Sequence, residues 1–435
     1  MKKILILSYH FPPMNVIASQ RSLGYANHLK KFGYDPTVVT FQWDRDIEAQ
    51  YCDKVNFEKE IQMESNEFFK VIKLPIYRSK RVNLLRKIEN SFLKRFGVIT
   101  SWLAGHLDTS SRLLSYKLSE KYFLKDHLRS NSYDFVIGVF SPHFNLANCS
   151  WVGKKFKIKY ILDFRDLWDN RIIKKDYKPT RTEKVQDFIY SFYWKLWLRD
   201  SCLFSITSEP WLNELEKLSN RKGVIITNGF ESSDFSVTSA VNEKFTIVHN
   251  GSLYEHQDLT PFLKGVSLFI QEVESPRIKI SFIGAKRNEN SENSYNRFLK
   301  NPNKIISSYI NSEYFELVPR MSRLDSIKRL QKADLLYFPS FPTAPGTYSG
   351  KIFEYLGCRK NILVVPKDNC VVDEIVGLTA SGQSMNTENE VFNFLKIKYE
   401  EWNSKGVCEY SGIDYEIDNF SRSSQTKKLI KALSQ

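Results

Sequence analysis

The sequence contains no long hydrophobic run. No segment approaches the roughly 18 consecutive apolar residues that a membrane-spanning helix needs. The short apolar stretch at residues 4–7 stops at Ser8 and carries no site that resembles a signal-peptide cleavage site, so we interpret it as the first strand of a fold. Neither a membrane-spanning protein nor a cleaved secretion signal is expected.

Paired cysteines are absent as well. The six cysteines are scattered, with no C-x-x-C pair and no zinc-binding spacing. Reduced thiols are the plain expectation, and they are typical of a cytoplasmic protein. The sequence also lacks internal repeats and low-complexity tracts.

Acidic residues are outnumbered by basic ones. The 435 residues include 63 Lys and Arg against 49 Asp and Glu, which gives a formal net charge of +14. By charge alone, a nucleic acid, an anionic lipid or a phosphorylated substrate would each suit this protein as a partner. None of the usual nucleic-acid-binding signatures is present, so we expect no nucleic-acid partner.

Strand and helix patterns alternate twice along the chain, which is too long for one core. A strand over residues 3–7, a helix over 21–32 and a strand over 37–41 open the first series. Its further strands are expected at residues 71–74, 135–140, 160–164, 201–207 and 223–227. The second series is expected at residues 245–250, 279–283, 314–318, 335–338 and 361–365. This α/β pattern predicts two doubly wound domains that meet near residues 228–231.

The most informative segment covers residues 346–355. It follows an apolar strand pattern that ends at Pro339, and it reads as a glycine-bearing loop followed by the start of a helix. Free backbone N–H groups at such a helix start favour an anion, although the helix dipole there disfavours a cation such as Lys351. A phosphate would explain the lysine, and Glu354 could accept hydrogen bonds from sugar hydroxyls beside it. The alternative is an ordinary strand-to-helix turn with an exposed Lys/Glu pair.

Residues 349–356, Ser-Gly-Lys-Ile-Phe-Glu-Tyr-Leu, resemble the donor-binding signature of retaining family 4 glycosyltransferases. The resemblance implies the GT-B fold: two doubly wound Rossmann-like domains that face a cleft, with a C-terminal helix that crosses back to the first domain. It implies an acceptor-binding domain over residues 1–228, a domain that binds the nucleotide-sugar over 229–412, and a crossing helix over 413–435. One departure is Gly346, which stands where the family usually has the first of two glutamates.

The same resemblance assigns the donor site. Glu354 would bind the ribose, while the loop and helix start would bind the diphosphate; two residues after residue 250 and an arginine after the strand at 314–318 would complete the site. The expected donor-binding residues are Gly251, Ser252, Arg320, Gly346, Thr347, Tyr348, Ser349, Gly350, Lys351 and Glu354. Family members usually carry an arginine and a lysine shortly after residue 254, but residues 255–258 here read Glu-His-Gln-Asp.

Catalytic and acceptor-binding residues are expected at strand ends of the first domain. His143 follows a strand and resembles the family histidine near the donor sugar, so the expected catalytic residues are His143, Lys351 and Glu354. A structural role for this loop histidine is the alternative. The expected acceptor-binding residues are Pro13, Arg21, Asp163, Arg165 and Asp166. Arg165 and Asp166 could instead pair with each other and brace their loop.

No metal site and no cofactor are expected. The pair Asp44 and Asp46 nominally forms a D-x-D motif, but it lies in a charged loop far from the phosphate elements, and we interpret it as solvated. The resemblance then implies a metal-independent retaining glycosyltransferase, whose partners are a nucleotide-sugar donor and a glycan or lipid-linked acceptor of the cell surface. A non-catalytic GT-B subunit and a nucleotide-sugar epimerase are the alternatives.

Two basic amphipathic segments suggest an anionic membrane surface as a further partner. Apolar residues at 85, 88, 92, 96, 99 and 103 follow helical spacing among six basic residues. Residues 188–199, with Trp194 and Trp197, could add aromatic anchors. Both stripes could equally be buried in the first domain. The expected location is the cytoplasm, with peripheral binding to the inner face of the membrane.

Overall fold

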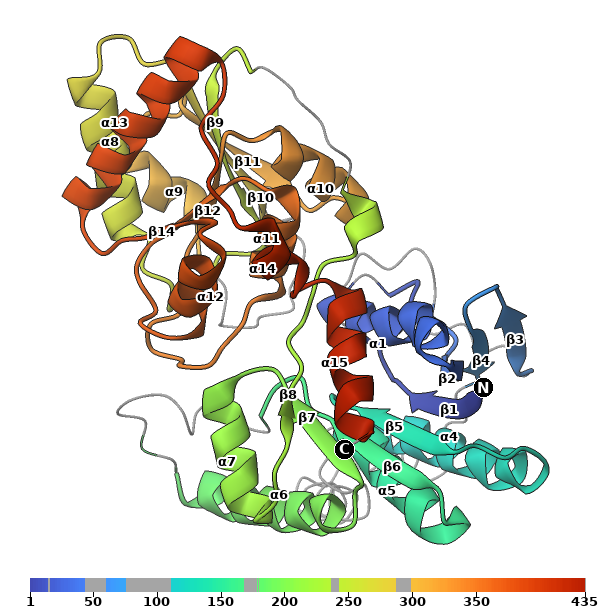
Figure 1. Cartoon of the computed structure of the whole chain (residues 1–435). Coiled ribbons are helices and arrows are strands. Elements are labelled where there is room, and N and C mark those ends of the chain that lie inside the picture. The colour runs from blue at the N-terminus through green and yellow to red at the C-terminus, as the bar shows by residue number, and fades with distance from the viewer. Residues whose placement is uncertain are drawn as a thin grey trace. The chain divides into compact units, whose positions relative to one another are not determined.

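The structure is a computed structural model of the whole chain. It describes residues 1–14, 16–43, 60–75, 111–167, 178, 180–235, 242–286 and 299–434. The chain divides into two compact units (Figure 1). The first contains the described residues up to Asn228 together with residues 422–434, and the second contains the described residues from Gly229 to Ser421.

The first unit is built on a sheet of eight strands. Their order is β3-β4-β2-β1-β5-β6-β7-β8, and every neighbouring pair is parallel except β3 with β4. The strands are β1 (Lys2–Leu7), β2 (Tyr34–Phe41), β3 (Gln62–Ser65), β4 (Lys70–Leu74), β5 (Phe135–Val139), β6 (Lys159–Asp163), β7 (Leu203–Ile206) and β8 (Val224–Ile225). The central strands are runs of buried apolar residues, as a sheet covered on both faces requires.

Helices connect and cover these strands. They are α1 (Ile17–His28), α4 (Ser111–Ser130), α5 (His143–Phe156), α6 (Arg181–Arg199), α7 (Glu209–Ser219) and α15 (Arg422–Leu433). The last of them, α15, packs against α1 (Figure 1). A Cβ atom added at Gly24 would lie 2.7 Å from Cδ of Arg422, so a glycine in α1 permits this close approach.

The second unit is built on an entirely parallel sheet of six strands, ordered β11-β10-β9-β12-β13-β14. The strands are β9 (Phe245–Asn250), β10 (Ile278–Lys286), β11 (Phe315–Pro319), β12 (Leu335–Phe338), β13 (Asn361–Val364) and β14 (Gly382–Ser384). The helices are α8 (Thr260–Glu272), α9 (Pro302–Ser307), α10 (Arg323–Lys332), α11 (Gly350–Cys358), α12 (Val371–Thr379), α13 (Glu388–Lys405) and α14 (Asp414–Asp418).

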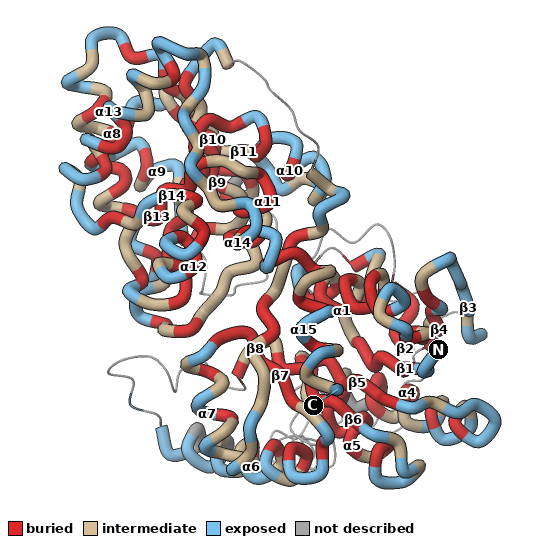
Figure 2. Tube along the Cα trace, viewed as in Figure 1, coloured by how far each residue is buried: buried red, intermediate tan, exposed pale blue. Residues whose placement is uncertain are grey.

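Each face of the second sheet has its own apolar core. One includes Phe262 of α8, whose ring stacks on that of Tyr337 in β12 with 3.6 Å between ring centroids. The other includes Phe353 and Leu356 of α11. Buried residues therefore follow the strands and the inner faces of the helices (Figure 2). α11 packs on one of these cores and carries the candidate site.

The predicted α/β architecture with two parallel sheets is confirmed. Each of the strands expected from residue 71 onward is present within two residues of its predicted ends, except that β10 continues three residues beyond its predicted end at residue 283. Among the strands that the structure describes, two were missed, β3 and β14. The structure also places residues 413–421, including α14, in the second unit, whereas the sequence analysis assigned them to the crossing segment. Phe420 accounts for this difference, because it belongs to the buried core that α11 and α12 share.

The tryptophans of α6 are core residues and not surface anchors. Trp194 and Trp197 expose 0% and 4% of their surface, and Trp194 packs on Phe164 with 4.5 Å between ring centroids. The expectation that these two side chains anchor a membrane is therefore wrong. The basic segment at residues 80–103 lies outside the described residues. Among the helices that the structure describes, none is long and apolar enough to cross a membrane.

Candidate functional site

The carboxyl edge of the second sheet gathers the expected donor-binding residues. Strands β9 and β12 are parallel neighbours, so the residues that follow them emerge at the same edge. Gly251 and Ser252 directly follow β9, and the loop after β12 leads into α11. Ser349 is the N-cap of α11, and its Oγ lies 3.5 Å from the backbone nitrogen of Lys351. A helix thus begins at this edge with backbone N–H groups that have no partner inside the helix.

Lys351 places an ammonium group at this helix start. Its Nζ donates a 3.0 Å hydrogen bond to the carbonyl oxygen of Ser252 and lies 5.9 Å from the ring centroid of Tyr254. Within the described part of the chain, no carboxylate lies at ion-pair distance from it. Burial lowers the pKa of Lys351 to about 7, and the charge of Glu354 opposes that shift only in part. An anionic ligand would stabilise the charged form of this half-buried lysine, which has no counter-ion among the described residues.

A glycine makes room for this lysine. Gly251 has φ of +110°, a conformation that favours glycine, and an added Cβ would lie 2.2 Å from Cε and 2.8 Å from Nζ of Lys351. The turn after β9 therefore needs a residue without a side chain for two reasons, its backbone conformation and the path of the lysine. Neither reason is visible in the sequence.

Glu354 lies one turn further along α11 and is held by an arginine that the sequence analysis missed. Nε of Arg323 donates a 2.8 Å hydrogen bond to Oε1 of Glu354, and its Nη1 donates a 2.5 Å hydrogen bond to Asp234. Arg323 and Glu354 expose 17% and 16% of their side chains. This ion pair orients the carboxylate, so Arg323 is a positioning residue for Glu354. The sequence pointed instead to Arg320, which is exposed.

The loop before α11 has a backbone that requires its glycine. Gly346 has φ of +79°, in the left-handed region that a glutamate would adopt only with strain. The side-chain oxygen of Thr347 is buried, and no described residue forms a hydrogen bond with it. Tyr348 packs on Phe353 with 5.4 Å between ring centroids. The missing first glutamate of the family pattern thus coincides with a turn built for glycine.

A buried histidine, His249, contacts the backbone of the turn after β9. His249 of β9 places Nδ1 3.2 Å from the carbonyl oxygen of Tyr337 and Nε2 3.1 Å from that of Gly251. Burial and the nearby charge of Lys351 hold its pKa well below the usual value. A neutral ring donates only one proton, so His249 can satisfy one of the two carbonyls at a time. No sequence pattern marks this residue, because it lies within an apolar strand.

In the first unit, His143 is the first residue of α5, at the carboxyl end of β5, as expected. Its ring stacks on Tyr190 with 4.8 Å between centroids and an interplanar angle of 10°. Its ring centroid also lies 4.9 Å from that of Phe140, in an edge-to-face arrangement. This aromatic setting fixes the orientation of the imidazole, and it is compatible with both the structural and the catalytic interpretation.

Arg21 and Asp163 form a buried structural pair, which corrects the expectation that they bind the acceptor. Their side chains expose 3% and 0%, and two hydrogen bonds of 2.7 and 2.6 Å join them. The remaining guanidinium protons bind the carbonyl oxygens of residues 226 and 227 and Oδ1 of Asn228. Tyr25 and Ser205 donate to Oδ1 of Asp163. No donor of the arginine is left for a ligand.

Arg165 and Asp166 pair with each other, which was the alternative considered for them. Nε and Nη2 of Arg165 lie 2.7 and 2.6 Å from Oδ2 of Asp166, and the two side chains expose 23% and 33%.

Pro13 lies in the exposed turn after β1, near His10. Burial and the charge of Arg165 lower the pKa of His10 to about 3, so this imidazole is neutral.

No metal-binding cluster of three or more His, Cys, Asp or Glu occurs among the described residues. The pair Asp44 and Asp46 lies outside the described residues.

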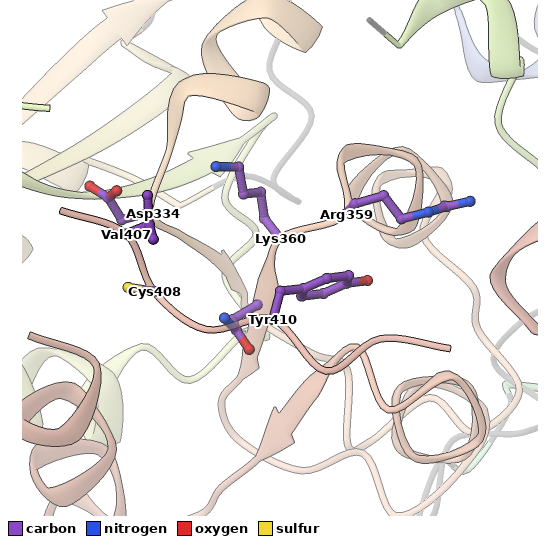
Figure 3. A pocket seen from close by; sticks show the side chains of 7 residues that line it. Asp334, Arg359, Lys360, Val407, Cys408 and Tyr410 are labelled. Carbon is purple, nitrogen blue, oxygen red and sulfur yellow. The ribbon is translucent and has the colours of Figure 1, made fainter. Parts of the chain in front are cut away.

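A cavity of about 210 Å³ opens at the amino ends of β12 and β13, the edge of the sheet opposite Lys351 (Figure 3). It is lined by Asp334, Arg359, Lys360, Asn361, Val407, Cys408 and Tyr410. Its place in the sheet separates it from the expected donor site.

Comparisons with known proteins identify the fold. No family model matches the chain, and no curated protein matches its sequence. Among solved structures, HepE from Anabaena in complex with UDP matches with a TM-score of 0.59 and 12% identity, with 99% of each chain covered. A UDP-forming trehalose-phosphate synthase from Burkholderia xenovorans, in complex with glucose-6-phosphate, matches with a TM-score of 0.60, 9% identity and complete coverage of both chains.

A third structure is similar over the whole chain. Sucrose-phosphate synthase from Thermosynechococcus elongatus matches with a TM-score of 0.57 and 10% identity over 100% of this chain and 94% of its own. At such identities the likeness shows the fold alone. Together with the two parallel sheets, it confirms that the chain has the GT-B fold.

Proposed function

We propose that this protein is a glycosyltransferase that binds a nucleotide-sugar donor at the carboxyl edge of its second sheet. The observation that carries the proposal is Lys351, a cation at a helix start for which the described residues supply no carboxylate partner, with Glu354 one turn beyond it. The diphosphate would lie against Lys351 and the backbone of residues 346–350, and the ribose would bind Glu354. The complexes of similar structures with UDP and glucose-6-phosphate support this assignment.

The proposed reaction is a retaining transfer that needs no metal ion. The bond between the anomeric carbon and the diphosphate oxygen breaks, and the acceptor oxygen forms the new bond on the same face. The acceptor proton passes to the leaving diphosphate. Lys351 would stabilise the negative charge that grows on that group, which is the electrostatic contribution that usually dominates such catalysis. His143 is proposed to lie near the donor sugar, and a cell-surface glycan precursor or lipid-linked oligosaccharide is the proposed acceptor.

A non-catalytic nucleotide-binding subunit is the second candidate. The observation that favours it is the absence of the family's arginine and lysine after β9. In their place Gln257 is buried and donates a 2.7 Å hydrogen bond to the carbonyl oxygen of Pro339, a structural role. Diphosphate charge would therefore be balanced mainly by Lys351.

Release of nucleoside diphosphate from a panel of nucleotide-sugars tests the proposal. We expect one donor to be hydrolysed and expect Lys351→Ala to lower its turnover, because the charge on the leaving group grows in the transition state. Lys360→Ala is the matched control, since this lysine lies at the opposite edge of the same sheet. Binding of a nucleoside diphosphate without turnover of any donor would favour the non-catalytic subunit, and sugar conversion without an acceptor would favour the epimerase. Absence of any nucleotide binding would refute the site.

A further inference from the structure

Helix α6 exposes three large apolar side chains on one side. Val185, Phe188 and Phe192 expose 60%, 71% and 58% of their surface. Their spacings of three and four residues place them on one face, opposite Tyr190, Trp194 and Trp197, which are buried. Among the described residues, Phe188 and Phe192 are the only phenylalanines that are largely exposed.

Four exposed cations extend the same face in both directions. Arg181 and Lys184 precede the apolar residues, while Lys195 and Arg199 follow them at helical spacing. Arg199 pairs with Asp200, and no ion pair joins the other three side chains to a carboxylate among the residues that the structure describes. We call these seven residues, from Arg181 to Arg199, the α6 stripe; at 1.5 Å per residue it is about 27 Å long. Figure 2 shows exposed residues along this helix.

We propose that the α6 stripe docks on an anionic lipid surface. Two phenylalanine rings and a valine would enter the boundary between headgroups and acyl chains, and the cations at both ends would meet anionic headgroups. A soluble polyanion would balance the charges but leave the rings in water. A second copy of the stripe would place cations against cations, which disfavours a symmetric dimer through this face. A lipid surface satisfies both chemistries at once.

Flotation of the full-length chain with lipid vesicles tests the proposal. The wild-type protein should float with vesicles that contain 30% phosphatidylglycerol but not with neutral phosphatidylcholine vesicles. Phe188→Ser with Phe192→Ser should abolish binding. Ile397→Ser with Leu378→Ser is the matched control, because these side chains expose 56% and 53% in the second unit and should not matter. Replacing Lys184 and Lys195 by Gln should weaken binding about fivefold per charge.

Several outcomes would overturn the proposal. These are failure of the wild-type protein to bind anionic vesicles, equal loss of binding in the Ile397/Leu378 control, and a dimer in solution that the Phe188/Phe192 variant dissociates. The last would show that a second copy, not lipid, covers the stripe. Binding of a nucleoside diphosphate should be the same in all variants, since α6 belongs to the other unit. A failure of vesicle binding would therefore not count against the donor site. A failure of nucleotide binding would likewise not count against the docking of the α6 stripe on lipid.

Discussion

Lys351 should make nucleotide affinity depend on pH. Because burial lowers its pKa to about 7 and a bound diphosphate would raise it again, the free protein must take up a proton to bind at alkaline pH. Above pH 7, affinity for a nucleoside diphosphate should fall by up to about tenfold per pH unit. Calorimetric titration between pH 7.5 and 9.5 measures this slope. Lys351→Arg, which stays charged, should bind with nearly constant affinity, and an equal slope in both proteins would contradict the assignment.

Glu354 should contribute to affinity through the ribose. Glu354→Ala removes charge-assisted hydrogen bonds worth roughly 1.5–3 kcal/mol, so nucleotide binding should weaken tenfold or more. Arg323→Gln releases the carboxylate from its ion pair and should give a smaller loss of the same kind.

The specificity control uses a 2′,3′-dideoxy nucleotide. The wild-type protein should prefer the ribose form, and Glu354→Ala should bind both forms equally. If Glu354→Ala keeps the preference, the ribose lies elsewhere.

The sequence predicted those residues of the candidate donor site that lie close together in the chain. Lys351 and Glu354 lie in one short pattern, so their proximity follows from helical spacing. Arg323 reaches Glu354 from another helix, and His249 is hidden in an apolar strand, so no local pattern marks them. Arg21 and Asp163 were misassigned because a buried ion pair and a ligand-binding pair have the same residue types, and only burial separates them.

At the scale of elements, the turn after β9 and the start of α11 should act as one unit. Gly251→Ala would place a methyl group 2.2 Å from Cε of Lys351, and the flexible end of the lysine would move. We expect Gly251→Ala to weaken nucleotide binding about as much as Lys351→Ala. The double variant should lose little more than either single variant, which a double-mutant cycle measures. Gly377→Ala is the control, because its Cβ would meet nothing within 4 Å. Additive losses would show that the two residues act separately.

The strands that the sequence predicted and the two it missed differ in their residues. β9 and β12 are central, and burial on both faces imposes the apolar runs that mark them. β3 and β14 each lie at one end of their sheets, as do β8 and β11, which were predicted. The residues of β3 and β14, Gln62–Ser65 and Gly382–Ser384, are largely polar because no layer covers them fully. These strands therefore lack an apolar pattern. They are defined by pairing with a neighbouring strand, which no local pattern predicts.

At the scale of the whole molecule, the Arg21–Asp163 pair should stabilise the first unit. It connects α1, β6 and β7 with the backbone of residues 226 and 227. Arg21→Met would leave a buried carboxylate without its partner, at a cost of about 3–5 kcal/mol in the free energy of unfolding. Urea unfolding measures this loss, and Arg21→Met with Asp163→Asn should recover part of it. Nucleotide binding by the second unit should be unaffected. Unchanged stability with impaired transfer would restore the acceptor-binding role.

The return of α15 to the first unit has a consequence for synthesis. Residues 229–421 form a unit that is continuous in sequence and can fold once it leaves the ribosome, but the first unit needs α15 beside α1 and must wait. At about 5–20 residues per second, the wait is roughly 10–40 s after residue 228 is made. During that time the surface of α1 around Gly24 is uncovered and available to chaperones. A premature stop codon just before Arg422 would thus injure the part of the protein that was synthesised first.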